Sequence, residues 1–309
     1  MSRTLLMAAA LFAAATLSAK ELKVLMIGNS FSQSVLSYLP RIVKAEKKHN
    51  LLLAQMMIGG CTLNRHIAEL KKAEDDPNYK PYGTNYQKRR RVNLPEMIKA
   101  EKWDIVTIQQ GSHESWNKEK FQPAANELIA YIRKNAPQAE IVVHQTWSYR
   151  NSDGRISGPK PGWGFDQKGM YDRLTANYTD LAKEHKLRVI PVGKAVQLFR
   201  EKTPVKYTPP TAEEKKNLVC PDLPKRAGDV VGNDWWAKDR KTGEMVIKTD
   251  NIHLNNDGNY LQGCVWYGFL FGEDPASIQF VPRNIGNKQA ALLRTCASEA
   301  LETFPQVKK

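Results

Sequence analysis

Short apolar runs alternate with segments of helical pattern along most of the chain. The apolar runs predict buried strands at Leu22–Ile27, Leu51–Ile58, Ile105–Gln109, Ile141–Gln145 and Leu187–Val192. Helical patterns lie between and after them, at Ser34–Lys48, Leu63–Lys72, Pro123–Asn135, Gly169–His185, Asp257–Phe271 and Lys288–Leu301. This alternation predicts an α/β fold with a mostly parallel five-stranded sheet and helices on both of its faces.

Two polar stretches interrupt the alternation, at 74–95 and 203–248. The first is punctuated by Pro and Gly, and the second holds five prolines and the pair Trp235-Trp236. Both are expected to be loop insertions in one domain that covers residues 20–309. Loops of this length in a compact domain are typical of binding elements or lids.

The N-terminus has the composition of a secretory signal peptide. Arg3 precedes an apolar, Ala-rich run, and small residues follow at 16–19, so we expect residues 1–19 to be removed. No other apolar run approaches the length of a membrane span, so a secreted or periplasmic protein is predicted. An oxidising compartment permits disulfides among the four cysteines, and the three possible full pairings stay open.

Composition and charge narrow the classes of function. Hydrophobic residues make up 41% of the chain and charged residues 25%, as in an ordinary globular protein. The formal net charge of +14 favours anionic surroundings, but an exported protein meets little nucleic acid, so a nucleic-acid partner is not expected. The sequence has no C-x-x-C, P-loop, dinucleotide fingerprint or H-E-x-x-H, and neither a metal nor a cofactor is predicted.

Reactive and flexible residues follow the predicted strands. Ser30 comes after the first strand, Gly60 after the second and the segment Gln109–Glu114 after the third, while Asp250 and His253 precede a late helix. In an open α/β sheet, ligands bind at the carboxyl ends of the strands. We therefore expect these residues to converge at one edge of the sheet.

The set contains the parts of a serine hydrolase. Ser30 needs a base to become a nucleophile, His253 can take its proton, and Asp250 can hold the imidazole in the required tautomer. The oxyanion of the intermediate needs about two or three preorganised N–H donors. The backbone N–H groups of Ser30 and Gly60 and one side-chain amide are the candidates.

In order and spacing, these motifs resemble the four blocks of the SGNH (GDSL-type) hydrolases. The blocks are Gly28-Asn29-Ser30, Gly60, Gln109-Gln110-Gly111-Ser112 and Asp250-x-x-His253, and the resemblance extends from residue 22 to about 271. It implies a three-layer, flavodoxin-like sheet of order 2-1-3-4-5. It also implies Ser30 as nucleophile, His253 as base and Asp250 as its orienting acid.

Two positions depart from the pattern of that family. Its usual Gly-Asp-Ser is Gly28-Asn29-Ser30 here, so position 29 keeps hydrogen-bonding capacity without charge. Its usual Gly-x-Asn-Asp is Gly111-Ser112-His113-Glu114, so the third oxyanion donor is open between Gln109, which we favour, Gln110 and His113.

The sequence therefore predicts an exported serine esterase that forms an acyl-enzyme, with a carbohydrate O-acetylesterase as the preferred activity. Asn29, Gln110, His113 and Trp147 are expected to contact a small-molecule or polysaccharide ester. The tryptophans in or near the loops have two possible roles, which are packing beneath the loops and stacking on sugar rings. Two alternatives stay open, which are a catalytically silent glycan-binding protein on the same fold and a flavodoxin-like cofactor protein.

Overall fold

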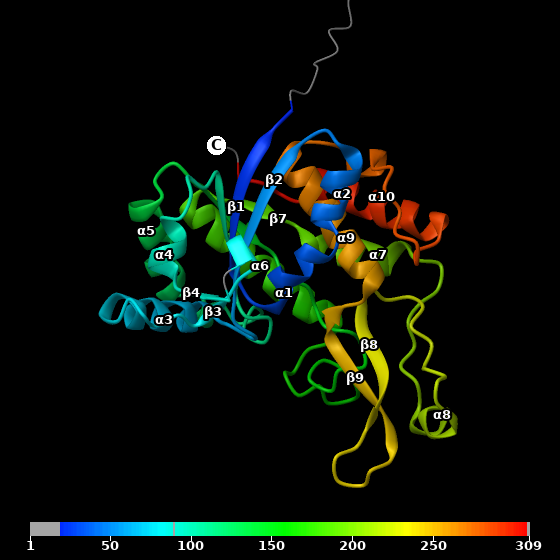
Figure 1. Cartoon of the computed structure of the whole chain (residues 1–309). Coiled ribbons are helices and arrows are strands. Elements are labelled where there is room, and N and C mark those ends of the chain that lie inside the picture. The colour runs from blue at the N-terminus through cyan, green and yellow to red at the C-terminus, as the bar shows by residue number, and fades with distance from the viewer. Residues whose placement is uncertain (1–18, 89, 308–309) are drawn as a thin grey trace, which may run out of the picture.

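A computed structural model describes residues 19–88 and 90–307 of the chain (Figure 1). The central sheet has the strand order β4-β3-β2-β1-β5-β6-β7. Its strands are β1 (Glu21–Gly28), β2 (Asn50–Met57), β3 (Tyr82–Gly83), β4 (Arg91–Val92), β5 (Ile105–Ile108), β6 (Glu140–His144) and β7 (Arg188–Ile190). Five of these strands run parallel to one another, in the spatial order β2, β1, β5, β6 and β7. The predicted α/β class and the order 2-1-3-4-5 are thereby confirmed.

Helices cover both faces of this sheet, which explains why its central strands are largely apolar. The helices are α1 (Ser30–Gln33), α2 (Leu39–Glu46), α3 (Leu63–Asp75), α4 (Leu94–Ile98), α5 (Ala124–Asn135), α6 (Gln167–His185), α7 (Val192–Lys202), α8 (Ala212–Asn217), α9 (Asn256–Phe271) and α10 (Asn287–Thr303). Helix α9 packs against α2, α7 and α10 on one side of the sheet, and α3 packs against α4 and α5 on the other (Figure 1). Most residues of α9 are buried, so this helix forms a central part of the core.

The expected helix at Ser34–Lys48 is wrong in its first half. The chain instead forms α1 directly after β1, then a short 3-10 helix at Ser34–Ser37, and only then α2. Pro40 lies in the first turn of α2, where its missing N–H is tolerated, whereas the same proline inside one long helix would remove a hydrogen bond. Helix α7 was not predicted, and its first residue, Val192, was assigned to the preceding strand, which in the structure ends at Ile190, before Pro191.

Within residues 19–88 and 90–307, the central sheet has seven strands, not the five expected. The stretch 74–95 contributes β3 and β4 as an antiparallel extension of the β2 edge, with Met57 paired to Gly83. Each of these strands is only two residues long, which is too short to produce a recognisable alternation. The insertion at 74–95 is therefore part of the sheet edge and not only a loop.

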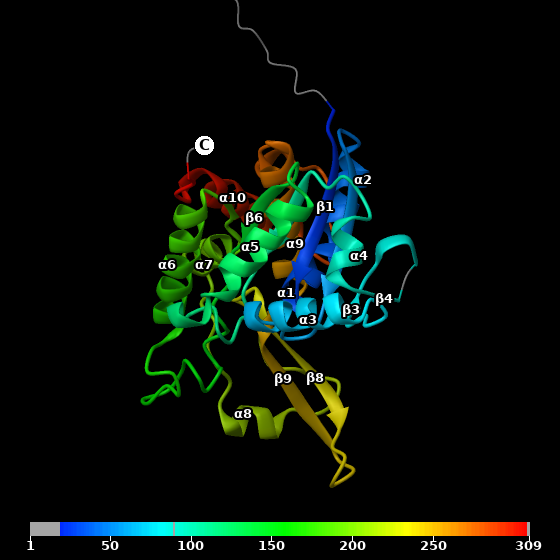
Figure 2. The same cartoon turned by 90° about the vertical axis from the view of Figure 1, so that its left-hand side faces the viewer.

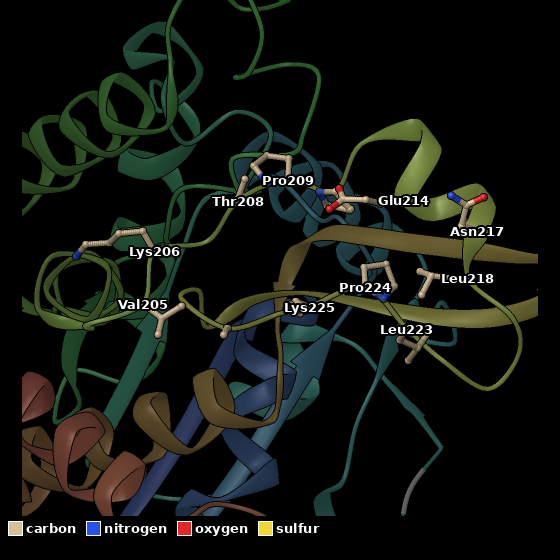
Figure 3. Close-up of a pocket in the computed structure, with 12 residues that line it drawn as sticks. Val205, Lys206, Thr208, Pro209, Glu214, Asn217, Leu218, Leu223, Pro224 and Lys225 are labelled. Carbon is tan, nitrogen blue, oxygen red and sulfur yellow. The ribbon is translucent and has the colours of Figure 1, made fainter.

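The second expected loop insertion contains regular structure as well. Strands β8 (Val231–Lys238) and β9 (Met245–Leu254) form an antiparallel hairpin that projects from the body, and α8 lies beside it (Figures 1 and 2). A cavity of about 530 Å³ lies between α8 and the neighbouring chain segments, lined largely by proline and aliphatic side chains (Figure 3). This cavity contains none of the predicted catalytic residues.

Three further expectations meet the structure only in part. The predicted signal peptide 1–19 lies outside the described residues except for Ala19. Within residues 19–88 and 90–307, no helix has the length and apolar character needed to cross a membrane. All four cysteines are free thiols, of which Cys220 is exposed and the other three are buried, so none of the three disulfide pairings is formed.

Candidate active site

Ser30 lies at the first position of α1, immediately beyond the carboxyl end of β1. The turn between strand and helix is made by Asn29, whose Oδ1 accepts a hydrogen bond from the Phe31 N–H at 3.0 Å and caps the helix. Gly28 is required just before this turn, since a Cβ there would lie 2.4 Å from Ser32 Oγ. The local sequence thus fixes the backbone of Ser30 and leaves its side chain at the surface.

The strand β9 brings Asp250 and His253 to Ser30, 223 residues away along the chain. His253 Nε2 lies 2.7 Å from Ser30 Oγ, and His253 Nδ1 lies 2.6 Å from Asp250 Oδ2. The three side chains form a continuous hydrogen-bonded series, as the sequence led us to expect. Their catalytic roles stay predictions.

The carboxylate of Asp250 is strongly stabilised in its charged form. Burial raises its pKa, but hydrogen bonds from the His253 ring and from the N–H groups of Ile252 and His253 outweigh burial and lower the pKa to about 2. At neutral pH, Asp250 is therefore charged and keeps the proton of His253 on Nδ1. The Nε2 atom is then free to accept a proton from Ser30.

Aromatic packing fixes the position of the histidine from behind. Phe31 stacks on Trp147 with a centroid distance of 3.9 Å and meets the His253 ring edge-on at 5.5 Å. Trp147 Nε1 also donates to the Ile252 carbonyl at 2.9 Å. Trp147 is 0% exposed, so the prediction that it contacts substrate is wrong, and its role is to support His253.

Buried arginines anchor the hairpin on which Asp250 and His253 lie. Arg150 forms a two-point ion pair with Asp234 of β8 at 2.9 and 3.1 Å and also donates to Asn251 of β9 at 3.0 Å. Arg200 also pairs with a buried carboxylate just before β8, where its Nε donates to both oxygens of Asp229 at 3.1 Å. These ion pairs were not predicted from the sequence, because no local motif links their members. Arg150 and Asp234, for example, are more than 80 residues apart.

Two backbone N–H groups are candidates for the oxyanion donors, namely those of Ser30 and of Gly60, whose turn is tied to the Ser30 turn by the hydrogen bond from Asn29 Nδ2 to the Cys61 carbonyl. Gly60 has a φ of +61° and lies in a tight turn closed by a hydrogen bond from Cys61 N to the Ile58 carbonyl at 3.1 Å. The N–H groups of Ser30 and Gly60 have no acceptor within the part of the chain that the structure describes. Preorganised donors of this kind are what a developing oxyanion requires.

The expected side-chain donor, Gln109, does not line the surface. Its Nε2 donates to Asn29 Oδ1 at 2.7 Å, its Oε1 accepts from His144 Nδ1 at 2.6 Å, and the side chain is only 2% exposed. The prediction of Gln109 as an oxyanion donor is therefore wrong in this structure, because both ends of its amide are engaged beneath Ser30.

Two of the remaining predicted substrate contacts are also buried. Gln110 accepts hydrogen bonds from the N–H groups of Leu63 and Gly111 and donates one to the Lys120 carbonyl. Its side chain therefore links backbone segments inside the protein. Asn29 is 1% exposed, and its amide is fully used within the protein. His113 alone among the predicted contacts is exposed, and its ring lies against Gly111 beside the Cys61 carbonyl.

An open depression of about 450 Å³ adjoins the reactive atoms. It is lined mainly by polar side chains, namely Ser30, Gln33, Ser34, Leu36, Ser37 and His253. Among residues 19–88 and 90–307, no group of three or more His, Cys, Asp or Glu side chains is placed to hold a metal ion. The arrangement suits nucleophilic attack by a serine on a substrate with polar surroundings.

The family described as "Domain of unknown function (DUF4886)" matches residues 23–207. A DUF4886 family protein from Bacteroides uniformis, known from a crystal structure, is similar with 24% identity, a TM-score of 0.71 and coverage of 93% of this chain and 97% of that chain. This likeness concerns the fold. The acetyl xylan esterase AlAXEase is more distant, with 15% identity, a TM-score of 0.46 and coverage of 81% and 100%. No curated protein matches the sequence.

Proposed function

The chain belongs to the DUF4886 family, and we propose that it is a serine hydrolase that cleaves ester bonds. One observation carries the proposal, namely the 2.7 Å contact between Ser30 Oγ and His253 Nε2. The 2.6 Å contact between His253 Nδ1 and Asp250 supports it, because it orients the imidazole for proton transfer.

Acylation follows from these contacts. Ser30 Oγ attacks the ester carbonyl carbon while its proton passes to His253 Nε2, and Asp250 stabilises the imidazolium that forms. The carbonyl oxygen becomes an oxyanion, which accepts hydrogen bonds from the N–H groups of Ser30 and Gly60. When the intermediate collapses, His253 returns the proton to the leaving alcohol, and the acyl group stays on Ser30.

Deacylation uses the same groups in reverse. A water molecule gives a proton to His253 Nε2 and attacks the acyl carbon, and the oxyanion again rests on the two N–H donors. Collapse of this intermediate returns the proton to Ser30 Oγ and releases the carboxylic acid. The partial exposure of His253, whose side chain is 37% accessible, supports access of water to this step.

For the substrate we propose an O-acylated carbohydrate. The depression beside Ser30 is open, and Gln33, Ser34 and Ser37 offer amide and hydroxyl groups there, which suits a short acyl group on a hydroxyl-rich substrate. The positive net charge of +14 also suits a substrate in anionic surroundings.

An exposed tryptophan beside the site supports this choice. Trp235 is 46% exposed and pairs across the hairpin with Lys248, which points to the same face of β9 as Asp250. Lys248 and Asp250 are two positions apart along β9, which corresponds to roughly 7 Å between their Cα atoms. Trp235 therefore presents an exposed indole on the same face of the hairpin as Asp250, and a flat indole there suits stacking on a sugar ring next to the one that carries the ester.

Labelling with a fluorophosphonate tests the activity itself. We expect the wild type and Ser298→Ala to be labelled, because Ser298 lies on α10 and its hydroxyl donates to Asp274, and we expect no labelling of Ser30→Ala. The same variants are then assayed with short acyl esters. Negligible and equal turnover in the wild type and Ser30→Ala would refute the hydrolase and favour the glycan-binding alternative.

The carbohydrate proposal is tested with a matched pair of hairpin variants. Trp235→Ala should raise the KM for an acetylated oligosaccharide at least about fivefold and leave turnover of a small acetate ester unchanged, because loss of a buried aromatic contact typically costs more than 1 kcal/mol. Met245→Ala is the control, since Met245 is 50% exposed on the opposite face of the same hairpin. Equal KM values for all three proteins would contradict the proposal.

We also propose that the protein is exported, on the composition of residues 1–19. N-terminal sequencing of the protein recovered from its native host tests this proposal. A mature chain that begins near residue 20 is expected, and a retained Met1 would contradict it.

A further inference from the structure

We propose that buried side chains beneath Ser30 form a hydrogen-bond chain of fixed direction, and that this chain requires asparagine, not aspartate, at position 29. Aspartate is the residue usual at this position in the hydrolases that the sequence resembles. The inference rests on the proposed function, because its main consequence concerns the oxyanion donors.

The hydrogen-bond chain runs through three side chains from the centre of the sheet to the turn at Gly60. His144 Nδ1 lies 2.6 Å from Gln109 Oε1, and Gln109 Nε2 lies 2.7 Å from Asn29 Oδ1. Asn29 Nδ2 then donates to the Cys61 carbonyl at 3.0 Å. All three side chains are at most 2% exposed, so water does not substitute for a lost partner.

Backbone groups at one end fix the direction of this series. The Phe31 N–H can only donate, so the atom of Asn29 that it meets must be the oxygen. The Cys61 carbonyl can only accept, so the other atom of Asn29 must be the nitrogen. Gln109 must therefore present its NH₂ group to Asn29 and its oxygen to His144, which requires a proton on His144 Nδ1.

The other end agrees with this assignment. His144 Nε2, left without a proton, faces Gln262 Nε2 at 3.3 Å. Gln262 Nε2 also donates to the Phe31 carbonyl at 2.9 Å, and its Oε1 accepts from Ser34 Oγ at 2.6 Å. Burial lowers the pKa of His144 to about 3, so the ring stays neutral at the working pH. Every member of the network has a partner of the correct kind.

The network acts on the oxyanion donor through the turn that holds Gly60. Ile58 N contacts the Gly28 carbonyl at 3.4 Å at the start of the turn, and Asn29 Nδ2 holds the Cys61 carbonyl at its end. An aspartate at position 29 has no hydrogen to donate, so two oxygens would face each other in a dry interior. The Cys61 carbonyl would move away and carry the Gly60 N–H with it.

Asn29→Asp tests the inference against a matched control, Asn93→Asp. Asn93 is also a buried helix cap, with Oδ1 accepting from Glu96 N and Nδ2 donating to the Pro77 carbonyl, but it lies at α4, away from Ser30. We expect both variants to lose thermal stability to a similar extent. Only Asn29→Asp should have a lower kcat on a short acyl ester, by about 10- to 100-fold, while its KM stays within about threefold of the wild-type value. The reason is that a displaced oxyanion donor reduces stabilisation of the transition state and leaves binding of the substrate unchanged.

The outcomes separate this inference from the proposed function. Unchanged or higher kcat in Asn29→Asp, with an active wild type, overturns the inference and leaves the hydrolase intact. An inactive wild type that is not labelled at Ser30 overturns the hydrolase, and ¹⁵N NMR of the histidine ring then decides on the network. A neutral His144 with its proton on Nδ1 supports the fixed direction, and a proton on Nε2 or a charged ring at pH 7 overturns it.

Discussion

Asparagine in place of Asp250 keeps the shape of the side chain and removes its charge. The Ile252 and His253 N–H groups need an acceptor, so the amide oxygen takes the place of Oδ1 and the NH₂ group faces His253 Nδ1. The imidazole must then carry its proton on Nε2, where it meets Ser30 and blocks proton transfer. Loss of the Asp250 charge also removes the electrostatic stabilisation of the imidazolium that forms at His253.

We expect kcat of Asp250→Asn on a short acyl ester to fall by about 10³- to 10⁴-fold, with little change in KM, because the wrong tautomer affects the chemical step. Asp239→Asn is the matched control. Asp239 Oδ1 accepts from the N–H groups two and three residues later, as Asp250 does, but contacts no histidine. If Asp250→Asn kept more than about a tenth of wild-type kcat while folded, the assignment of His253 as the base would be refuted.

Three further outcomes follow from buried groups. Burial lowers the pKa values of His66 and His144 from 6.5 to about 3, so both rings take up protons on unfolding between these pH values. The free energy of unfolding should therefore fall as pH drops from 6.5 toward 3, by up to about 1.4 kcal/mol per pH unit for each ring. Urea titrations that show constant or rising stability over this range would contradict the expectation. Arg150→Ala should lower the free energy of unfolding by about 3–5 kcal/mol, because it leaves Asp234 buried without its partner. Denaturant midpoints measure this loss, and a loss below about 1 kcal/mol would show that the ion pair of Arg150 and Asp234 does not stabilise the fold. Ellman's reagent should modify one thiol, Cys220, in the native protein, and rapid reaction of a second thiol would contradict the packing of the buried cysteines.

Spacing in the sequence predicted the convergence at the sheet edge for a physical reason. Parallel strands present their carboxyl ends on one side, so residues that follow β1, β2 and β5 must meet there, however far apart they are in the chain. Ser30 and Gly60 are placed in this way by their strands. Asp250 and His253 depended on the motif alone, and the strand β9 that holds them went unrecognised within an insertion expected to be a loop.

The roles of the buried amides were not predictable from the sequence. Gln109 and Asn29 are polar residues at strand ends, where both a substrate contact and an internal hydrogen bond are reasonable. The deciding partner is His144, which is the last residue of a different strand, β6, and has no motif that links it to either residue. Trp147 illustrates the same difficulty, because a tryptophan near a loop is compatible with stacking on a ligand and with the packing on Phe31 that the structure has.

The ion pair of Arg150 and Asp234 lies near the base of the β8–β9 hairpin, and the turn 239–244 lies at its far end. Chain length added at that tip would not alter the anchoring of Asp250 and His253, because exposed loop tips accept insertions readily. Relatives on this scaffold can therefore diverge in reach over bulky polymers while the chemistry stays constant. The tip is also the natural point for grafting a targeting module that would deliver this centre to a chosen surface.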